Sequence, residues 1–182
     1  RKPMEDHNIK IVREMGEFEF PADFLLVAAM NPCPCGNYPD LNRCTCTSAQ
    51  IQNYVGKLSQ PFLDRIDLCV EVQKVQYSDL ADTGKEEDSK TIRERILKAR
   101  QVQAERYRGE NVLTNAQLSM QRIEEVCVLG AAEKEIMEKA YERLGLSARS
   151  YHKVLRVART IADLEEKEKI EGKHLREALS YR

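Results

Sequence analysis

Tryptophan is absent from the 182-residue sequence, and aromatic residues make up only 6% of it. A core must therefore be built mainly from leucine, isoleucine, valine and alanine. No apolar run approaches the roughly 20 residues that a membrane-spanning helix needs. The N-terminus leads into no hydrophobic segment, so no signal peptide is expected. We expect no membrane contact and a cytoplasmic location, which disfavours disulfides among the six cysteines.

Net charge is also almost absent. The 29 lysines and arginines are balanced by 30 acidic residues, which leaves a formal charge of −1. Binding to DNA through bulk charge requires many basic side chains concentrated near phosphates. DNA could then be bound only by a local basic patch, or by a basic patch assembled from several subunits.

The eight glycines form no phosphate-binding loop. None belongs to a G-x-x-x-x-G-K-[ST] pattern, the Walker A sequence that cradles the phosphates of ATP. No apolar strand ends in the Asp-Glu pair, typical of Walker B, that would hold magnesium. The chain is therefore not expected to hydrolyse ATP by itself.

The first part of the chain is predicted to be α/β structure. Residues 9–13 and 17–20 flank Gly16 and indicate a β-hairpin. The seven apolar residues Phe24–Met30 are typical of a strand buried on both faces of a parallel sheet. The alternation along Ile66–Val72 predicts a second strand. Short helices are expected over residues 47–58 and 61–65, the first of them capped by a hydroxyl side chain.

The second part is predicted to be a helical bundle. Gly130 and Gly145 lie where C-terminal helix caps are expected. We expect the first helix to bury Ile92, Ile96, Leu97 and Val102. The predicted helices cover residues 90–107, 119–128, 131–144, 147–166 and 173–181. The resulting domain plan is an α/β core portion at 1–75, an acidic linker at 76–88 and an all-α domain at 89–182.

Two polar residues near the predicted strands could carry chemistry. Asn31 directly follows the apolar run, and ligands bind at the carboxyl ends of strands in open α/β sheets. The alternative for Asn31 is a plain turn, since Asn-Pro is a common turn dipeptide. Arg65 lies between Asp64 and Asp67. It could form a solvated salt-bridge cluster, or it could stabilise a transferring phosphoryl group as an arginine finger.

A third basic candidate lies in the predicted helix at 147–166. Arg149 is in its first turn, where the helix macrodipole disfavours a cation. Lys153 and Arg156 share a face with Arg149 at helical spacing, and cations beside a helix N-terminus create a place suited to an anion. A merely solvated basic face is the alternative. The apolar stripe of the same helix is predicted to be bundle core: Tyr151, Val154, Leu155, Ala158, Ile161 and Ala162.

Four cysteines form two closely spaced pairs. Cys33 and Cys35 are separated from Cys44 and Cys46 by eight residues. Four thiolates so close together could enclose a tetrahedral Zn²⁺, although zinc pairs usually have two to four residues between the ligands. Reduced loop cysteines are the alternative. Cys69 and Cys127 are expected to be core residues of a strand and a helix.

Five stretches resemble the magnesium-chelatase-like ComM/YifB family of AAA+ ATPases. The resemblance extends over nearly the whole chain. The stretches are Phe20–Gly36, Pro61–Leu68, Asn115–Ser119, Leu144–Leu164 and His174–Arg182.

The resemblance implies both a fold and roles for the three polar candidates. It implies the end of an AAA+ core with a partial parallel sheet, a β-hairpin insertion at 9–20 of the chelatase and MCM type, and a helical lid. Asn31 matches the sensor 1 residue, Arg65 the arginine finger and Arg149 the sensor 2 arginine. In the family, an N-terminal domain, Walker A and Walker B precede the position of Arg1.

The family's members are homo-hexameric motors that use ATP and Mg²⁺. Those linked to natural transformation are thought to drive branch migration of DNA, so DNA is the expected partner. Two alternatives remain open. One is a chelatase-type ATPase that remodels a protein client, and the other is a zinc-stabilised interaction module.

Overall fold

The computed structural model describes residues 3–73, 75 and 87–182. The chain divides into two compact units, residues 1–66 and 67–182, which are described separately below. Most of the predicted linker lies outside the described residues.

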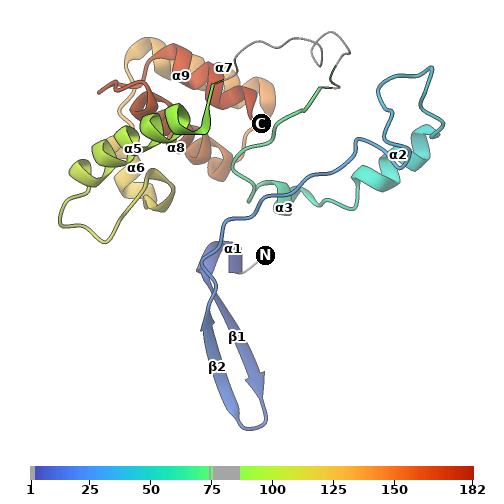
Figure 1. Ribbon diagram of the computed structural model, residues 1–182, viewed down its shortest axis with the longest axis horizontal. Helices are drawn as coiled ribbons and strands as arrows, with labels where there is room; N and C mark the ends of the chain where they lie inside the picture. The colour runs from blue at the N-terminus through green and yellow to red at the C-terminus, as the bar shows by residue number, and fades with distance from the viewer. Residues whose placement is uncertain (1–2, 74, 76–86) are drawn as a thin grey trace. The chain divides into compact units, whose positions relative to one another are not determined.

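The first unit begins with a β-hairpin, as predicted (Figure 1). Helix α1 (Pro3–Asp6) leads into β1 (Asn8–Arg13), which pairs antiparallel with β2 (Gly16–Pro21). Ile9 is opposite Phe20 and Ile11 is opposite Phe18, so these four apolar side chains share one face of the ribbon. All four are exposed in this chain.

The rest of the first unit contains two short helices, α2 (Ser48–Val55) and α3 (Gln60–Leu63), close to the predicted positions. A capping box begins α2. The Thr47 hydroxyl accepts a hydrogen bond from the Gln50 backbone N–H, and the Gln50 side chain accepts one from the Thr47 N–H. These two bonds satisfy N–H groups that a helix start otherwise leaves unpaired.

The predicted parallel sheet is not formed. Phe24–Met30 and Ile66–Val72 contain no strand, and the two-stranded hairpin is the sheet that the described residues form. Leu25 and Val27 are 89% and 83% exposed. A buried parallel strand depends on ladders to neighbouring strands and on helices covering both faces. The described residues supply neither to these segments. Cys69, expected in the core, is exposed for the same reason, whereas Cys127 is buried as predicted.

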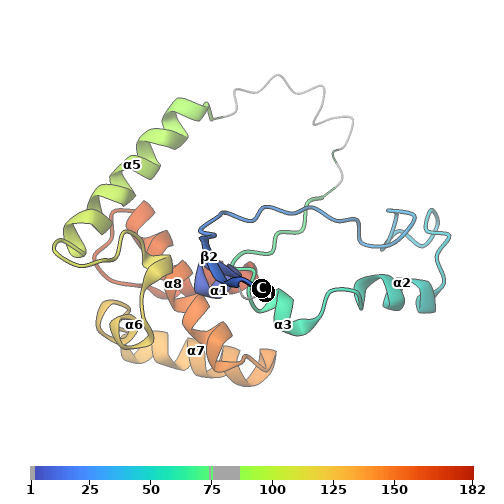
Figure 2. The same cartoon turned by 90° about the horizontal axis from the view of Figure 1, so that it is seen from below.

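The second unit is the predicted helical bundle (Figure 2). Gly145 caps α7 in the left-handed conformation, as expected, but Gly130 is the N-cap of α7 rather than the C-cap of the preceding helix. No described helix combines the length and the apolar character needed to cross a membrane. The elements are α5 (Ser89–Arg106), the 3₁₀ turn η1 (Asn115–Gln117), α6 (Met120–Val126), α7 (Ala131–Leu144), α8 (Ala148–Leu164) and α9 (Gly172–Ser180).

Helix α8 is the centre of this bundle. It packs against α5, η1, α6 and α9, and its apolar stripe is buried as predicted, with Tyr151 partly buried at the edge. Its N-cap, Ser147, accepts a hydrogen bond from the Ser150 N–H. The core around α8 comprises Tyr107, Leu118, Ile123, Cys127, Leu129, Met137, Val154, Leu155, Ala158, Ile161, Ile170, Leu175 and Ala178.

The buried face of α5 differs from the prediction. Its expected apolar residues, Ile92, Ile96, Leu97 and Val102, are all exposed. The helix instead buries Ala99 and Gln103, because this face carries the groups that bond to a buried carboxylate on α8.

That carboxylate, Asp163, is a fully buried hub of ionic hydrogen bonds. Arg106 binds it with two guanidinium nitrogens, one of them at 2.9 Å, and Arg159 Nε donates to it at 3.1 Å. Asn115 Nδ2 adds a bond of 2.8 Å and Gln103 Nε2 one of 3.2 Å. The cluster therefore joins α5, η1 and α8 through one side chain.

The hub predicts a specific dependence of stability on pH. Burial by itself would raise the pKa of Asp163, but the hydrogen bonds from Arg106 and Asn115 and the charge of Arg159 outweigh it and lower that pKa. A lowered folded-state pKa gives stability that is present above the unfolded carboxyl pKa of about 3.9 and is lost as pH falls through the folded value. In urea unfolding at pH 7 to 3, the stability difference between the wild type and Asp163→Asn should shrink below about pH 4. A difference that stays constant to pH 3 would contradict this assignment.

Candidate functional site

Asn31 lies at the end of the exposed apolar segment and at the start of the cysteine loop. A Cβ placed on Gly36 would be 3.6 Å from Asn31 Nδ2 and 3.7 Å from Asn31 Cγ, so the Asn31 side chain lies against the Gly36 backbone. Gly36 has a φ of +79° and donates its N–H to the Cys33 carbonyl at 3.0 Å. The turn at Gly36 thus connects the position of Asn31 to that of the cysteines.

Arg65 follows α3 and is held by two partners in its own unit. One guanidinium nitrogen contacts Glu5 Oε2 at 2.7 Å and the other donates to the Pro61 carbonyl. Only 14% of the side chain is exposed, and the buried Nε has no hydrogen-bond partner. The partner in this ion pair, Glu5, is 60 residues away from Arg65 in the sequence. Arg65 is thus a fixed cation with unused donor capacity.

The four clustered cysteines come together as the sequence predicts. The Sγ atoms of Cys33, Cys35, Cys44 and Cys46 all lie within 4.8 Å of one another. Cys33–Cys35, Cys35–Cys44 and Cys33–Cys44 are separated by 3.4, 3.6 and 3.8 Å. Cys33 is buried and the other three are partly buried. The group has the donor set and the spacing of a metal site.

Backbone N–H groups give these thiols unequal acidities. Hydrogen bonds from Asn37 and Thr45 lower the pKa of Cys35 to about 5. The N–H of Cys35 donates to Cys46, but burial and the neighbouring sulfurs outweigh this bond and raise the pKa of Cys46 to about 12. When several thiols lie in contact, the loss of a proton from one of them makes the next loss harder, so their pKa values move apart.

The three basic residues of α8 have different surroundings. Arg149 is exposed in the first turn of the helix. Lys153 is buried, with Nζ 4.0 Å from Asp67 Oδ1, and Arg156 is half-buried and donates to the Leu118 carbonyl. Burial lowers the pKa of the Arg156 guanidinium. Lys153 and Arg156 are therefore not part of a solvated face, which leaves Arg149 as the accessible cation of the three.

The most connected charged cluster was missed from the sequence. The sequence analysis did not single out Arg106, Arg159 or Asp163. One signal was available, since Leu155, Arg159 and Asp163 follow one another at four-residue intervals on the buried side of α8. Charged residues at core spacing indicate a buried pair.

The chain thus consists of a first unit that carries a cysteine loop and two polar candidates, followed in the sequence by an all-α unit. Residues 1–80 match the family described as magnesium chelatase, subunit ChlI, and residues 86–182 match the family described as magnesium chelatase, subunit ChlI C-terminal. The chain belongs to the magnesium chelatase family.

Curated relatives agree with this assignment. Competence protein ComM of Haemophilus influenzae is 45% identical over 183 residues, and the uncharacterized protein YifB of Salmonella typhimurium is 40% identical over the same length. Both alignments cover 100% of this chain and 35% of the relative. An uncharacterized protein of Mycobacterium tuberculosis is 37% identical over 90% of this chain and 32% of its own length. The chain thus spans about a third of the length of these relatives.

Proposed function

We propose that this chain is the nucleotide-sensing end and the lid of a ring-forming AAA+ ATPase that acts on DNA. The observation that carries the proposal is the pair of family matches, at 1–80 and 86–182, together with 45% identity to a competence protein along the entire chain. The parent would use ATP and Mg²⁺ and assemble as a homo-hexamer. Its phosphate-binding loop lies outside this sequence.

Three residues would act on the nucleotide. Asn31 offers an amide that can hold the attacking water or a phosphate oxygen. Arg65 offers a planar, permanently charged guanidinium to the γ-phosphate bound by a neighbouring subunit. Arg149, exposed at the N-terminal end of α8, offers a second cation where the helix itself favours an anion.

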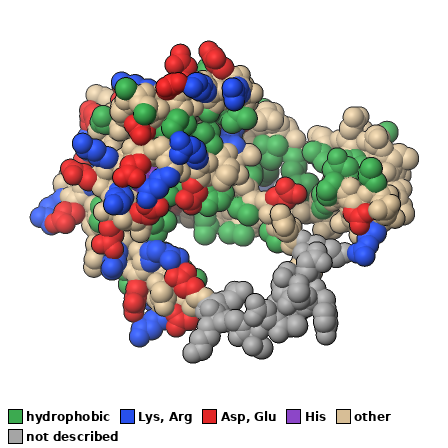
Figure 3. Space-filling model, turned by 90° about the horizontal axis from the view of Figure 1, so that it is seen from above, with side chains coloured by type: hydrophobic (Ala, Val, Ile, Leu, Met, Phe, Trp, Pro, Cys, Tyr) green, Lys and Arg blue, Asp and Glu red, His purple; other side chains and the backbone are tan. Residues whose placement is uncertain are grey.

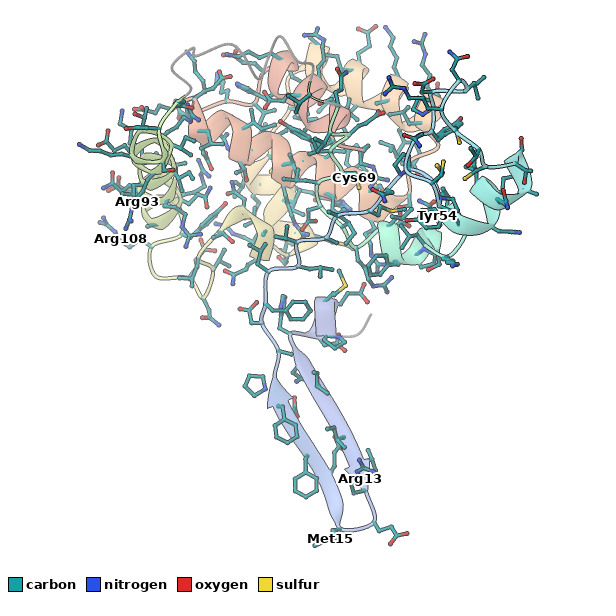
Figure 4. All side chains as sticks on the ribbon, turned by 45° about the vertical axis from the view of Figure 1, so that its right-hand side comes forward. Arg13, Met15, Tyr54, Cys69, Arg93 and Arg108 are labelled. Atoms are coloured by element: carbon teal, nitrogen blue, oxygen red, sulfur yellow. The ribbon has the colours of Figure 1, made fainter. Side chains whose placement is uncertain are left out.

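DNA would be contacted by the assembled ring rather than by a strongly basic face of one chain. Acidic and basic side chains are interspersed on the face shown in Figure 3. On the hairpin, Lys10 is neutralised by Glu17 at 3.1 Å and Glu19 at 3.7 Å. Arg13 and Met15 mark the tip of the hairpin (Figure 4), where contacts from several subunits would add together.

The salt dependence of DNA affinity tests this choice of partner. The full-length ring should bind DNA with an affinity that falls steeply with salt, by a logarithmic slope of about −0.9 for each phosphate neutralised on a duplex. Nucleotide-dependent assembly without DNA binding would support a protein client instead. Failure of both nucleotide-dependent assembly and DNA binding would support an interaction module.

Arg149→Ala in the full-length protein should weaken ATP binding or uncouple it from ring assembly, because the N-terminal end of α8 loses the exposed cation in its first turn. ATP affinity can be measured by calorimetry and assembly by analytical ultracentrifugation. The matched control is Arg108→Ala, which removes an exposed arginine paired with Glu105 and should change neither quantity. If Arg149→Ala has the ATP affinity and the assembly of the wild type, Arg149 is a solvated surface residue without a role in nucleotide binding.

A further inference from the structure

The separations among Cys33, Cys35 and Cys44 match an edge of a metal tetrahedron, and the fourth sulfur, that of Cys46, lies within 4.8 Å of all three. A Zn–S bond of about 2.3 Å places the sulfurs of a tetrahedral site about 3.8 Å apart. The separations of 3.4, 3.6 and 3.8 Å among Cys33, Cys35 and Cys44 are close to that value. A disulfide requires about 2.05 Å, so the sulfurs are not arranged as bonded pairs.

The loop that carries the cysteines is held by turn hydrogen bonds rather than by regular secondary structure. Residues 31–46 form turns and bends without a helix or strand. One-residue spacing within each pair is accommodated in the first pair by the tight turn in which the Gly36 N–H bonds to the Cys33 carbonyl. Closing such a loop by a metal would supply the ordering free energy that a small apolar core cannot.

We propose that Cys33, Cys35, Cys44 and Cys46 bind one Zn²⁺ in a closed, structural site, and that the metal-closed loop fixes Asn31 through its contact with Gly36. Soft thiolate ligands select zinc among the common divalent ions, and four protein ligands leave no open position for catalysis. Coordination releases to solvent the protons of those thiols that are still protonated. Only the importance of a fixed Asn31 for nucleotide sensing rests on the function proposed above.

Metal content of the purified 182-residue chain tests the site directly. Zinc, measured by plasma mass spectrometry after dialysis, should be one equivalent per chain. It should be close to zero in the Cys35→Ser/Cys46→Ser double variant. Cys69→Ser is the matched control, because Cys69 is an exposed cysteine outside the cluster, and it should keep the full equivalent. Equal zinc in the wild type and the double variant would overturn the proposal.

Cobalt substitution separates loss of the site from loss of the fold. Co²⁺ added to the metal-free chain should give the intense visible absorption of tetrahedral thiolate coordination in the wild type and Cys69→Ser, but not in the double variant. The helical circular dichroism of the double variant should be retained, since α5 to α9 pack around their own core. An octahedral cobalt spectrum in the wild type would refute the Cys₄ site.

The coupling to Asn31 has its own readout. Addition of Zn²⁺ to the metal-free chain should shift the Asn31 side-chain amide signal in a ¹⁵N correlation spectrum, assigned with Asn31→Asp. Asn53 on α2, outside the loop, is the internal reference and should not move. If zinc binds but the Asn31 signal does not shift, the metal site is supported and its coupling to Asn31 is contradicted. Both readouts are independent of ATP turnover, so a failure of the proposed motor function would leave them interpretable.

Discussion

Arg65→Ala in the full-length ring is expected to lower kcat for ATP hydrolysis by about 10³-fold or more, with ATP affinity nearly unchanged. The physical reason is that a guanidinium supplied by a neighbouring subunit stabilises the charge that develops on the transferring phosphoryl group. It contributes little to ground-state binding. Steady-state turnover together with nucleotide titration measures both quantities. Because the planar fork matters as well as the charge, Arg65→Lys should not restore activity.

The ion pair between Arg65 and Glu5 provides a control for this prediction. In this chain Arg65 is paired with Glu5 at 2.7 Å, so a catalytic role requires it to exchange that partner for phosphate oxygens. Glu5→Gln should therefore retain turnover. If Arg65 were only a structural partner of Glu5, the two substitutions would have similar effects.

Mixed rings would show whether Arg65 acts across a subunit boundary. Rings of Arg65→Ala subunits are expected to be inactive, as are rings that lack the lysine of the Walker A loop. Mixing the two should recover part of the activity, because some interfaces then combine an intact loop with an intact Arg65. No recovery in rings shown to be mixed would contradict a finger that acts in trans.

Asp163→Asn is expected to lower the free energy of unfolding of the helical unit by about 3–5 kcal/mol. The substitution preserves shape but leaves Arg106 and Arg159 close together without their shared anion, and Arg159 is 2% exposed. Removing one partner of a buried ionic cluster costs more than the net value of the pair, because the remaining charges stay desolvated. Urea unfolding followed by circular dichroism measures the change.

Glu135→Gln is the matched control for Asp163→Asn. Both substitutions convert a carboxylate to an amide, but Glu135 is paired with Lys139 on the exposed face of α7. Exposed pairs contribute little to stability, so Glu135→Gln should leave the unfolding curve nearly unchanged. Equal effects of the two substitutions would show that the Asp163 cluster is not the hub of the bundle.

Helix positions could be predicted from this sequence because their signals are local. Ser147 and Gly145 mark a helix start and a helix end through hydrogen bonds and a backbone conformation that involve only neighbouring residues. The stripe on α8 also repeats with helical period. The hairpin was also predicted, with the difference that its turn is formed by Glu14 and Met15, while Gly16 is the first residue of β2 and pairs with Arg13.

The sequence wrongly predicted two parallel strands, because the residues of a segment do not by themselves determine whether it forms a strand. Phe24–Met30 has the composition of a buried strand, but a strand exists only where a neighbour completes its hydrogen bonds, and composition does not show whether one is present. The face of α5 was mispredicted for a related reason. The orientation of α5 is set by hydrogen bonds to Asp163, which is 60 residues away from Gln103 in the sequence. The assumption that the apolar side of a helix is its buried side could not reveal that partner.

Part of the candidate site was within reach of the sequence. The cysteine spacing was sufficient to predict that the four sulfurs come together. Asn31, Arg65 and Arg149 were proposed from position and charge, supported by the family resemblance, and their roles remain predictions. The pairing of Arg65 with Glu5 joins residues 60 positions apart, which no local pattern indicates.

The ATPase rate of the full-length protein, measured without DNA and with single-stranded and branched DNA, tests the central claim most directly. Clear stimulation by DNA is predicted, because a motor that acts on DNA couples its turnover to that substrate. Turnover that is indifferent to both forms of DNA would contradict the account and favour a chelatase-type ATPase whose client is a protein.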